Sequence, residues 1–458
     1  MPNLTDVGNA ERFATANNGM LRYCPDNKTW YVWTGAYWRE DKTQEVLLRA
    51  KAVAKSIATE YTGDNSDTQT QYLRHARRSE SLKALEAMIR LAQAESDMVM
   101  ALESMNRDHW LLNTLSGTID LRTGSIRSYI KDDNITLMAP VAYDAGADFG
   151  LWDEFLLRVM PDDADREFLQ RAVGYSLTGS CREEVMFFIH GRGRNGKSTF
   201  VNILLDMLGP YAGQANPDAF LVRRSDGPRN DLYNLFGKRF VAASEATDES
   251  KFNDTLIKQV TGRDVVTVNP KFKDEFSYLP TWKLWFTANH RPALHTVDSA
   301  IAARVLLIPF TICVPAGARD PRLRDRITSD PAERSRVLTW AVEGASKWLA
   351  DRLQVSKSVR NATMHYLKEQ DVVGQFIVDC CTLHPDAVVT KGMLYQAFSG
   401  YCKRSGITPC CSITTFGNRL VEATDNTLRS TRHRGDWVWF GITLTAKASL
   451  RPSDHEKV

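Results

Sequence analysis

Residues 191–198 read Gly-Arg-Gly-Arg-Asn-Gly-Lys-Ser, a complete G-x-x-x-x-G-K-S sequence between the apolar run 185–189 and a helical pattern over residues 199–205. Glycines in such a segment let backbone N–H groups close around a phosphate, while its lysine reaches the β- and γ-phosphates and its serine can ligate Mg²⁺. Because strand, loop and helix follow in the required order, a turn that merely joins two elements is a poor alternative. The segment predicts a site for ATP and Mg²⁺. Its expected contacts are Gly191, Arg192, Gly193, Arg194, Asn195, Gly196, Lys197, Ser198 and Thr199.

Two polar residues follow later apolar strands. Glu245 ends the run 240–245, and an ATPase needs a carboxylate at the end of a strand near the loop, to activate water and hold Mg²⁺. We therefore predict Glu245 as general base and, with Ser198, as a metal ligand. Asn289 closes the run 284–288, where it can orient the water or sense the γ-phosphate. The alternative for Asn289 is an ordinary turn residue.

Composition limits the remaining classes. The chain has 458 residues, 43% apolar and 25% charged, which indicates a soluble globular protein of about three domains. Its net charge of +3 means that any nucleic-acid surface must be a local concentration of Lys and Arg. With no signal region and no apolar run of about 20 residues, we expect a cytosolic protein without a membrane partner. The eight cysteines form no C-x-x-C pair, so we expect neither a disulfide framework nor a structural metal.

Strands alternate with helices around the loop, which predicts an α/β fold with a three-layer P-loop core. Residues 30–38 predict a hairpin whose aromatic face serves core packing or, alternatively, stacking of single-stranded bases. The C-terminal pattern of two helices and two strands is typical of a winged helix. The expected units are 1–105 (mainly helical, with the hairpin), 106–180 (a second hairpin and a helical lead-in), 181–315 (P-loop core), 316–365 (helical segment and linker), 366–447 (winged helix) and 448–458 (flexible tail).

Taken together, the motifs resemble superfamily 3 helicases, specifically the phage and plasmid primase-helicase family that includes the poxvirus-type NTPases. The resemblance covers nearly the whole chain. We expect the chain to lack a primase, because residues 1–108 show no strand with the alternating aspartates that primase chemistry needs. The segments that carry it are 110–124 (Trp-Leu-Leu-Asn through Arg-Thr-Gly), 174–179 (Gly-Tyr-Ser-Leu-Thr-Gly), 195–200, 238–245 and 257–264.

The resemblance implies an AAA+-like, ATP-driven DNA helicase of 3′ to 5′ polarity that forms a hexameric ring and acts in replication of a phage, prophage or plasmid. It implies that Lys271, Phe272 and Lys273 form a hairpin that contacts single-stranded DNA in the ring channel. It also implies that Arg304 is an arginine finger supplied to the neighbouring subunit's ATP. A separate primase or replication protein is an expected partner.

Two residues depart from the family pattern. Ala303 stands where many members carry a second arginine, and Ser244 stands where other branches carry a first carboxylate. We therefore expect metal coordination to rest mainly on Ser198 and water, with Glu245 acting on the attacking water.

The predicted winged helix carries a local concentration of basic residues that can contact duplex phosphates. The alternative use of this domain is protein contact within the ring. The expected DNA contacts are Arg419, Arg429, Arg432 and Arg434, with His433 beside them.

Two other function classes stay open. An ATP-dependent origin-binding or loading factor would remodel DNA without processive unwinding, and strand separation coupled to turnover would distinguish it from a helicase. A small-molecule phosphotransferase could use the same loop, but the extra domains argue against it.

Overall fold

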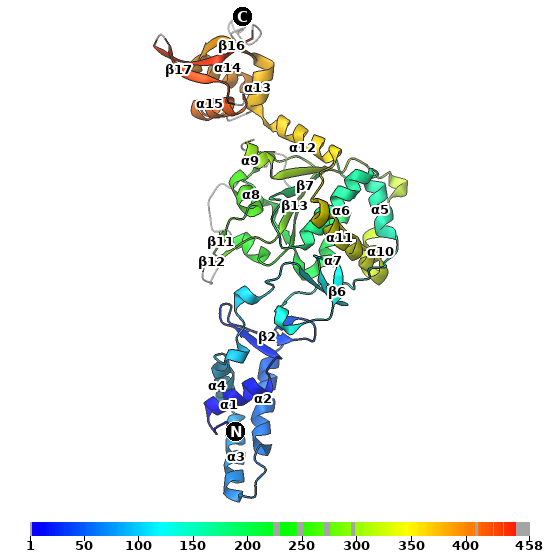
Figure 1. The fold of residues 1–458 in the computed structure, drawn as a ribbon, viewed down its shortest axis with the longest axis vertical. Helices are drawn as coiled ribbons and strands as arrows, with labels where there is room; N and C mark the ends of the chain where they lie inside the picture. Colours follow the sequence, from blue (N-terminus) through cyan, green and yellow to red (C-terminus); the bar gives the residue numbers. More distant parts are fainter. Residues whose placement is uncertain are drawn as a thin grey trace, which may run out of the picture.

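The computed structural model describes residues 2–222, 230–244, 251–269, 275–294, 298–405, 407, 411–424, 426–433 and 435–445. The molecule is elongated, with an N-terminal helical part at one end, the central sheet in the middle and the C-terminal domain at the other end (Figure 1). Helix α12 leads from the middle part toward the C-terminal domain. No helix in the part of the chain that the structure describes is long and apolar enough to cross a membrane.

A sheet of five parallel strands in the order β15-β7-β13-β9-β8 forms the middle part. It confirms the predicted α/β core and four of its strands, whereas β8 was missed because Ala-Gly-Gln-Ala has almost no apolar pattern. Strand β13 lies between the strand before the phosphate loop and the strand before Glu245. The bounds are β7 Met186–His190, β8 Ala212–Ala215, β9 Phe240–Ser244, β13 Lys283–Ala288 and β15 Val305–Pro309.

Alternate residues of these strands enter two separate cores. Phe187 and Trp285 belong to the core under one set of helices, while Phe188 and Phe286 belong to the core under the other set. This arrangement is the expected three-layer architecture, since a parallel sheet is buried on both faces. The first layer contains α5 Leu151–Val159, α6 Asp163–Leu177, α7 Lys197–Leu208, α10 Leu323–Ser329 and α11 Pro331–Asp351. The second contains α8 Asp254–Thr261, α9 Ser299–Ala302 and α12 Lys357–Gln370.

Helices α6 and α11 pack unusually closely at two glycines. A Cβ at Gly174 would lie 2.0 Å from the backbone nitrogen of Ala345, and one at Gly344 would lie 2.1 Å from the carbonyl oxygen of Gln170. Glycine is therefore required at both positions. Gly174 opens the motif 174–179, so the first residue of that motif has a packing role.

The N-terminal part combines helices with the predicted hairpin of β2 and β3. Trp33 lies opposite Trp38, both rings are buried, and Nε1 of Trp38 donates to the Lys131 carbonyl at 3.0 Å. These aromatic residues pack into the protein, so a base-stacking platform at this pair is wrong. The elements are α1 Asp6–Ala16, β1 Leu21–Cys24, β2 Thr29–Trp33, β3 Trp38–Glu40, α2 Glu45–Ser56, α3 Ser66–Ser79 and α4 Leu82–Ala92.

A second small sheet joins this part to the central sheet, and it confirms the hairpin predicted near residue 120. The backbone N–H of Asn113 donates to the Tyr211 hydroxyl at 3.1 Å, and Trp110 stacks on Trp348 of α11. The strands are β4 Leu111–Thr114, β5 Gly117–Asp120 and β6 Ser125–Arg127.

Two buried cations at the amino edge of the central sheet complete this junction. Arg239 donates to the carbonyls of Leu177 (2.9 Å) and Leu111 (2.6 Å). Lys283 donates to the carbonyls of Thr178 and Ser180, the latter at 3.2 Å. The last carbonyls of a helix have no partner within it, so these cations satisfy the end of α6 and tie it to the sheet.

The C-terminal domain contains the two helices and the strand pair that the sequence predicts. An additional strand, β16, pairs with β18 to give the sheet order β16-β18-β17, and the sequence prediction missed it. The bounds are α13 Val372–Cys380, β16 Cys381–Thr390, α14 Lys391–Arg404, α15 Ile413–Glu422, β17 Arg429–His433 and β18 Asp436–Leu444.

Candidate functional site

The phosphate loop connects the carboxyl end of β7 to the amino end of α7. Gly193, Arg194 and Gly196 have φ angles of +94°, +55° and +85°. Successive residues with such backbone turn their N–H groups toward one concave side, which suits an anion. A Cβ at Gly196 would also lie 2.8 Å from the side chain of Val159, so glycine is required there.

Lys197 is nearly buried, with 6% of its surface exposed. Its Nζ donates to the Gly191 carbonyl at 2.7 Å, to Oδ1 of Asn195 at 3.0 Å and to Oδ1 of Asn289 at 2.9 Å. Burial lowers the pKa of this lysine. Three acceptors match the three donors of an ammonium group, and a phosphate oxygen is a stronger acceptor than any of them. Lys197 is thus positioned to exchange its partners for a nucleotide.

Asn195 positions Lys197 through its side-chain amide. Its Nδ2 donates to the Phe310 carbonyl at 2.6 Å, and its Oδ1 accepts from Lys197. Asn195 is buried, so its side chain belongs to the framework of the loop, although the sequence suggested a nucleotide contact. Arg192, Arg194 and Ser198 are exposed, and Thr199 is partly exposed.

Asn289 follows β13, and the structure brings it together with Lys197 as the sequence motifs suggest. Within β13, the Thr287 hydroxyl donates at 2.9 Å to Oγ of Ser244, the last residue of the neighbouring strand β9. Glu245 lies outside the described residues. Because carboxyl ends of parallel strands share one edge, Ser244 brings the chain to the loop's side of the sheet just before Glu245.

His190, the residue before the loop, was missed by sequence reasoning. Burial, together with the positive charges of Arg291 and Lys197, lowers the pKa of His190 to about 4. Its ring is therefore neutral at neutral pH and adds no charge beside the loop. Its position directly before the first glycine of the loop is the only sequence signal.

Arg304 lies at the opposite edge of the sheet from the loop. Strand β15 begins at Val305 beside Met186 and ends at Pro309 beside His190, so Arg304 precedes the whole strand, roughly 13 Å or more from the loop edge. Its guanidinium donates to the Ala300 carbonyl at 3.0 Å and pairs with Glu184 at 3.2 Å. The structure does not bring Arg304 to the loop of its own chain, so a role toward a neighbouring copy stays a prediction.

Lys271, Phe272 and Lys273 lie outside the described residues. The strands on either side of them do pair, since Val268 of β11 (Val266–Val268) lies opposite Phe276 of β12 (Phe276–Tyr278). This antiparallel pair is the stem that the predicted hairpin requires.

The segment that follows Asn289 is attached to α12. The Tyr366 hydroxyl donates to the Pro292 carbonyl at 2.5 Å, and Arg291 pairs with Glu369 at 2.5 Å. Part of this segment, β14 (Ala293–Leu294), pairs with β10 (Lys251–Phe252). A continuous set of contacts therefore runs from Lys197 to the helix that leads into the C-terminal domain.

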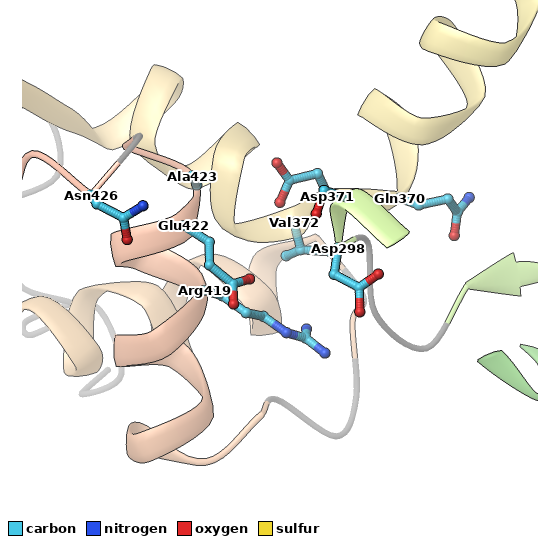
Figure 2. A pocket seen from close by; sticks show the side chains of 9 residues that line it. Asp298, Gln370, Asp371, Val372, Arg419, Glu422, Ala423 and Asn426 are labelled. Carbon is cyan, nitrogen blue, oxygen red and sulfur yellow. The ribbon is translucent and has the colours of Figure 1, made fainter. Parts of the chain in front are cut away.

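A pocket of about 330 Å³ lies between the start of α9 and the C-terminal domain, away from the phosphate loop. Figure 2 shows the side chain of Arg419 pointing toward Asp298, with Glu422 on the same helix and Asp371 nearby. The sequence groups Arg419 with the basic residues of the C-terminal hairpin as a DNA contact, and this role stays a prediction for a side chain that lines the pocket.

Two of the expected DNA contacts, Arg429 and Arg432, lie exposed on β17. Arg434 lies outside the described residues. His433 ends β17 and is exposed as well.

Three family models match the chain in succession. Residues 10–161 match a family described as D5 N terminal like, residues 189–304 match a family of unknown function (DUF5906), and residues 368–443 match a family described as Poxvirus D5 protein-like. The chain is therefore similar to D5-like proteins over residues 10–161 and 368–443. Its D5-like segments flank the P-loop core on both sides.

The curated relatives that resemble this chain come from large DNA viruses. It is 27% identical over 53% of its length to "Putative helicase 022R" of Frog virus 3 (isolate Goorha), covering 27% of that protein. It is 25% identical over 46% of its length to "Putative helicase L207/L206" of Acanthamoeba polyphaga mimivirus, covering 22% of that protein. The chain thus spans about a quarter of the length of these relatives.

One solved structure shares the fold of this chain. The apo structure of the C-terminal region of NrS-1 matches 95% of this chain and 99% of its own, with a TM-score of 0.50 and 10% sequence identity. At this identity the likeness concerns the architecture alone.

Proposed function

We propose that the chain is an NTP-hydrolysing motor that unwinds DNA, a helicase of superfamily 3. The observation that carries this proposal is the contact between Lys197 and Asn289 at the carboxyl edge of the sheet, with β13 between the loop strand and the strand before Glu245. This arrangement supports a site in which Lys197, the sensing amide of Asn289 and the proposed carboxylate of Glu245 act on one nucleotide. The names of the viral relatives support the same reading.

In the proposed reaction, the β- and γ-phosphates of ATP take the place of the present acceptors of Lys197, and the loop N–H groups hold the phosphate oxygens. The exposed Ser198 at the amino end of α7 fits Mg²⁺, which would neutralise phosphate charge when bound. Glu245 accepts a proton from the attacking water while the bond to ADP breaks, and Asn289 orients that water. The products are ADP and phosphate.

Assembly completes the site in this proposal. Arg304 leaves its contact with Glu184 and stabilises the charge on the γ-phosphate of a neighbouring copy, which makes hydrolysis depend on a ring, proposed to be hexameric. Lys271, Phe272 and Lys273 carry one strand of DNA through the ring in the 3′ to 5′ direction. Arg429, Arg432 and Arg434 add contacts to phosphates from the C-terminal domain, a proposed winged helix. We place this activity in replication of a phage, prophage or plasmid, alongside a separate primase.

Strand displacement on forked DNA with ATP and Mg²⁺ tests the proposal. The native chain should separate the strands, and Lys197→Ala should abolish this activity while keeping the melting temperature of the native chain. Arg304→Ala should lose hydrolysis but regain part of it when mixed with Lys197→Ala, because each variant supplies what the other lacks. A native chain that hydrolyses ATP and binds DNA yet separates no strands would instead be an origin-binding or loading factor.

A further inference from the structure

The hairpin of β17 and β18 carries an exposed tryptophan that the sequence analysis did not assign. Trp437 is 53% exposed, although it lies two residues from Trp439, which is buried in the core of the domain. Figure 1 shows this hairpin projecting from the side of the C-terminal domain. Tryptophan has a large apolar ring and is enriched where proteins contact other molecules, so an exposed indole on a projecting hairpin is a candidate contact.

Register divides the basic residues of the hairpin between its two faces. Arg432 lies directly opposite Trp437, so their side chains share one face. Arg429 and His433 are an odd number of residues from Arg432 and lie on the other face. Arg432 and Trp437 therefore form one surface, and Arg429 does not belong to it.

The face with Trp437 looks toward the helices of the domain. Trp439 shares this face, and a Cβ at Gly417 of α15 would lie 3.4 Å from its ring. The ammonium of Lys391, the first residue of α14, lies 5.0 Å from the centroid of Trp437 and 4.6 Å from that of Trp439. This cation–π contact orients the exposed ring against one cation and leaves its other side to a ligand.

We propose that Trp437, Arg432 and Lys391, together named the Trp437 face, bind single-stranded DNA, with an unpaired base stacked on Trp437. This inference rests on the proposed function and specifies where the C-terminal domain holds the separated strand. Arg432 and Lys391 supply positive charge for phosphates, and the ring accepts any base because every base has a flat π-surface. Bases of an intact duplex are stacked on each other and do not offer that surface.

Charge favours nucleic acid over a protein partner. The described part of the hairpin, residues 429–433 and 435–444, contains three basic side chains and one acidic one, Asp436, which register places opposite His433 on the other face. Interfaces between proteins need a wider apolar centre than one ring. A single aromatic between cations instead matches the alternation of base and phosphate along a strand.

The experiment measures binding of the full chain, without nucleotide, to a labelled oligothymidylate and to an abasic strand of the same length and charge. Trp437→Ala should weaken binding to the oligothymidylate about tenfold and leave binding to the abasic strand unchanged, since a stacked base contributes roughly 1–3 kcal/mol. Trp437→Phe should recover most of the affinity. Arg432→Ala should weaken binding to both strands.

Arg429→Ala is the matched control, because it removes the same charge from the other face of the same hairpin and should preserve the difference between the two strands. Equal losses on both strands for Trp437→Ala, or no loss on either, would overturn the proposal. So would an equal loss on a blunt duplex. These results are independent of the helicase assignment, since a chain that fails to unwind forked DNA can still show the base-dependent loss.

Discussion

Each of the two edges of the central sheet contains a buried lysine, but the two lysines donate to different kinds of acceptor. At the carboxyl edge, Lys197 is 6% exposed and contacts one backbone carbonyl and two side-chain amides. At the amino edge, Lys283 is 2% exposed and contacts only backbone carbonyls, those of Thr178, Ser180 and Thr281. Among the described residues, neither lysine pairs with a carboxylate.

The difference lies in whether the partners can be replaced. The partners of Lys197 belong to a loop with an exposed anion-binding side, and one of them is the side chain of Asn289 from another strand. Two of the backbone carbonyls that Lys283 contacts lie just after α6, and the third lies just before β13, so these groups cannot leave without disrupting this junction. The ammonium of Lys283 also lies 4.8 Å from the ring centroid of Tyr175, which belongs to the motif 174–179. A buried cation thus indicates function only where its acceptors are exchangeable.

Lys283→Met should have the largest effect, and on stability. It leaves carbonyls at the end of α6 without a donor in the core, so we expect the free energy of unfolding to fall by about 3–5 kcal/mol. Chemical denaturation measures this loss, with the exposed Lys51→Met as control. A stability equal to that of the control would show that water or the relaxed helix end replaces the lysine.

Lys197→Ala should affect activity instead. Because the ammonium acts on charge that develops during hydrolysis, we expect ATP turnover to fall by at least about 100-fold with little change in thermal stability. Steady-state release of phosphate measures the loss of ATP turnover, and a thermal melt measures the change in stability. A large drop in melting temperature would mean that both edges of the sheet are structural.

The pH dependence of the free energy of unfolding should report on the buried Lys283. Burial lowers the pKa of Lys283 to about 7, below its unfolded value of about 10.4. Between these values the unfolded chain binds more protons, so stability rises with pH by at most about 1.4 kcal/mol per pH unit and is flat for this group below pH 7. The difference in unfolding free energy between the native chain and Lys283→Met should therefore grow from pH 7 to pH 9. A constant difference would contradict the lowered pKa.

Asn195→Ala should have the smallest effect, about 1 kcal/mol in stability with a loss of turnover of roughly five- to tenfold, because it removes one partner of Lys197 and one buried hydrogen bond. Asn195→Asp keeps the acceptor for Lys197 but loses the donor to the Phe310 carbonyl. If both variants retain native turnover, Asn195 does not position the lysine.

The sequence correctly predicted elements whose signal is local. The phosphate loop, the strands before Ser244 and Asn289 and the helices from Trp152 to Leu177 follow from glycine spacing and apolar periodicity. Strands β8 and β16 were missed because their apolar pattern is weak. No sequence pattern indicated that the side chain of Arg419 lines a pocket together with Asp298, and its contact with DNA stays a prediction.

By itself, the sequence determined that a glycine-rich loop stands between a strand and a helix, because the backbone angles of that loop require glycines at set positions. Only the tertiary structure decided which cations act on a ligand and which hold the fold. Arg239 and Lys197 both occur within family motifs, and no local pattern distinguishes them. Their roles depend on which oxygen acceptors lie within hydrogen-bonding distance after the chain has folded. The carbonyls that accept from Arg239 lie at least 62 residues away from it in the sequence.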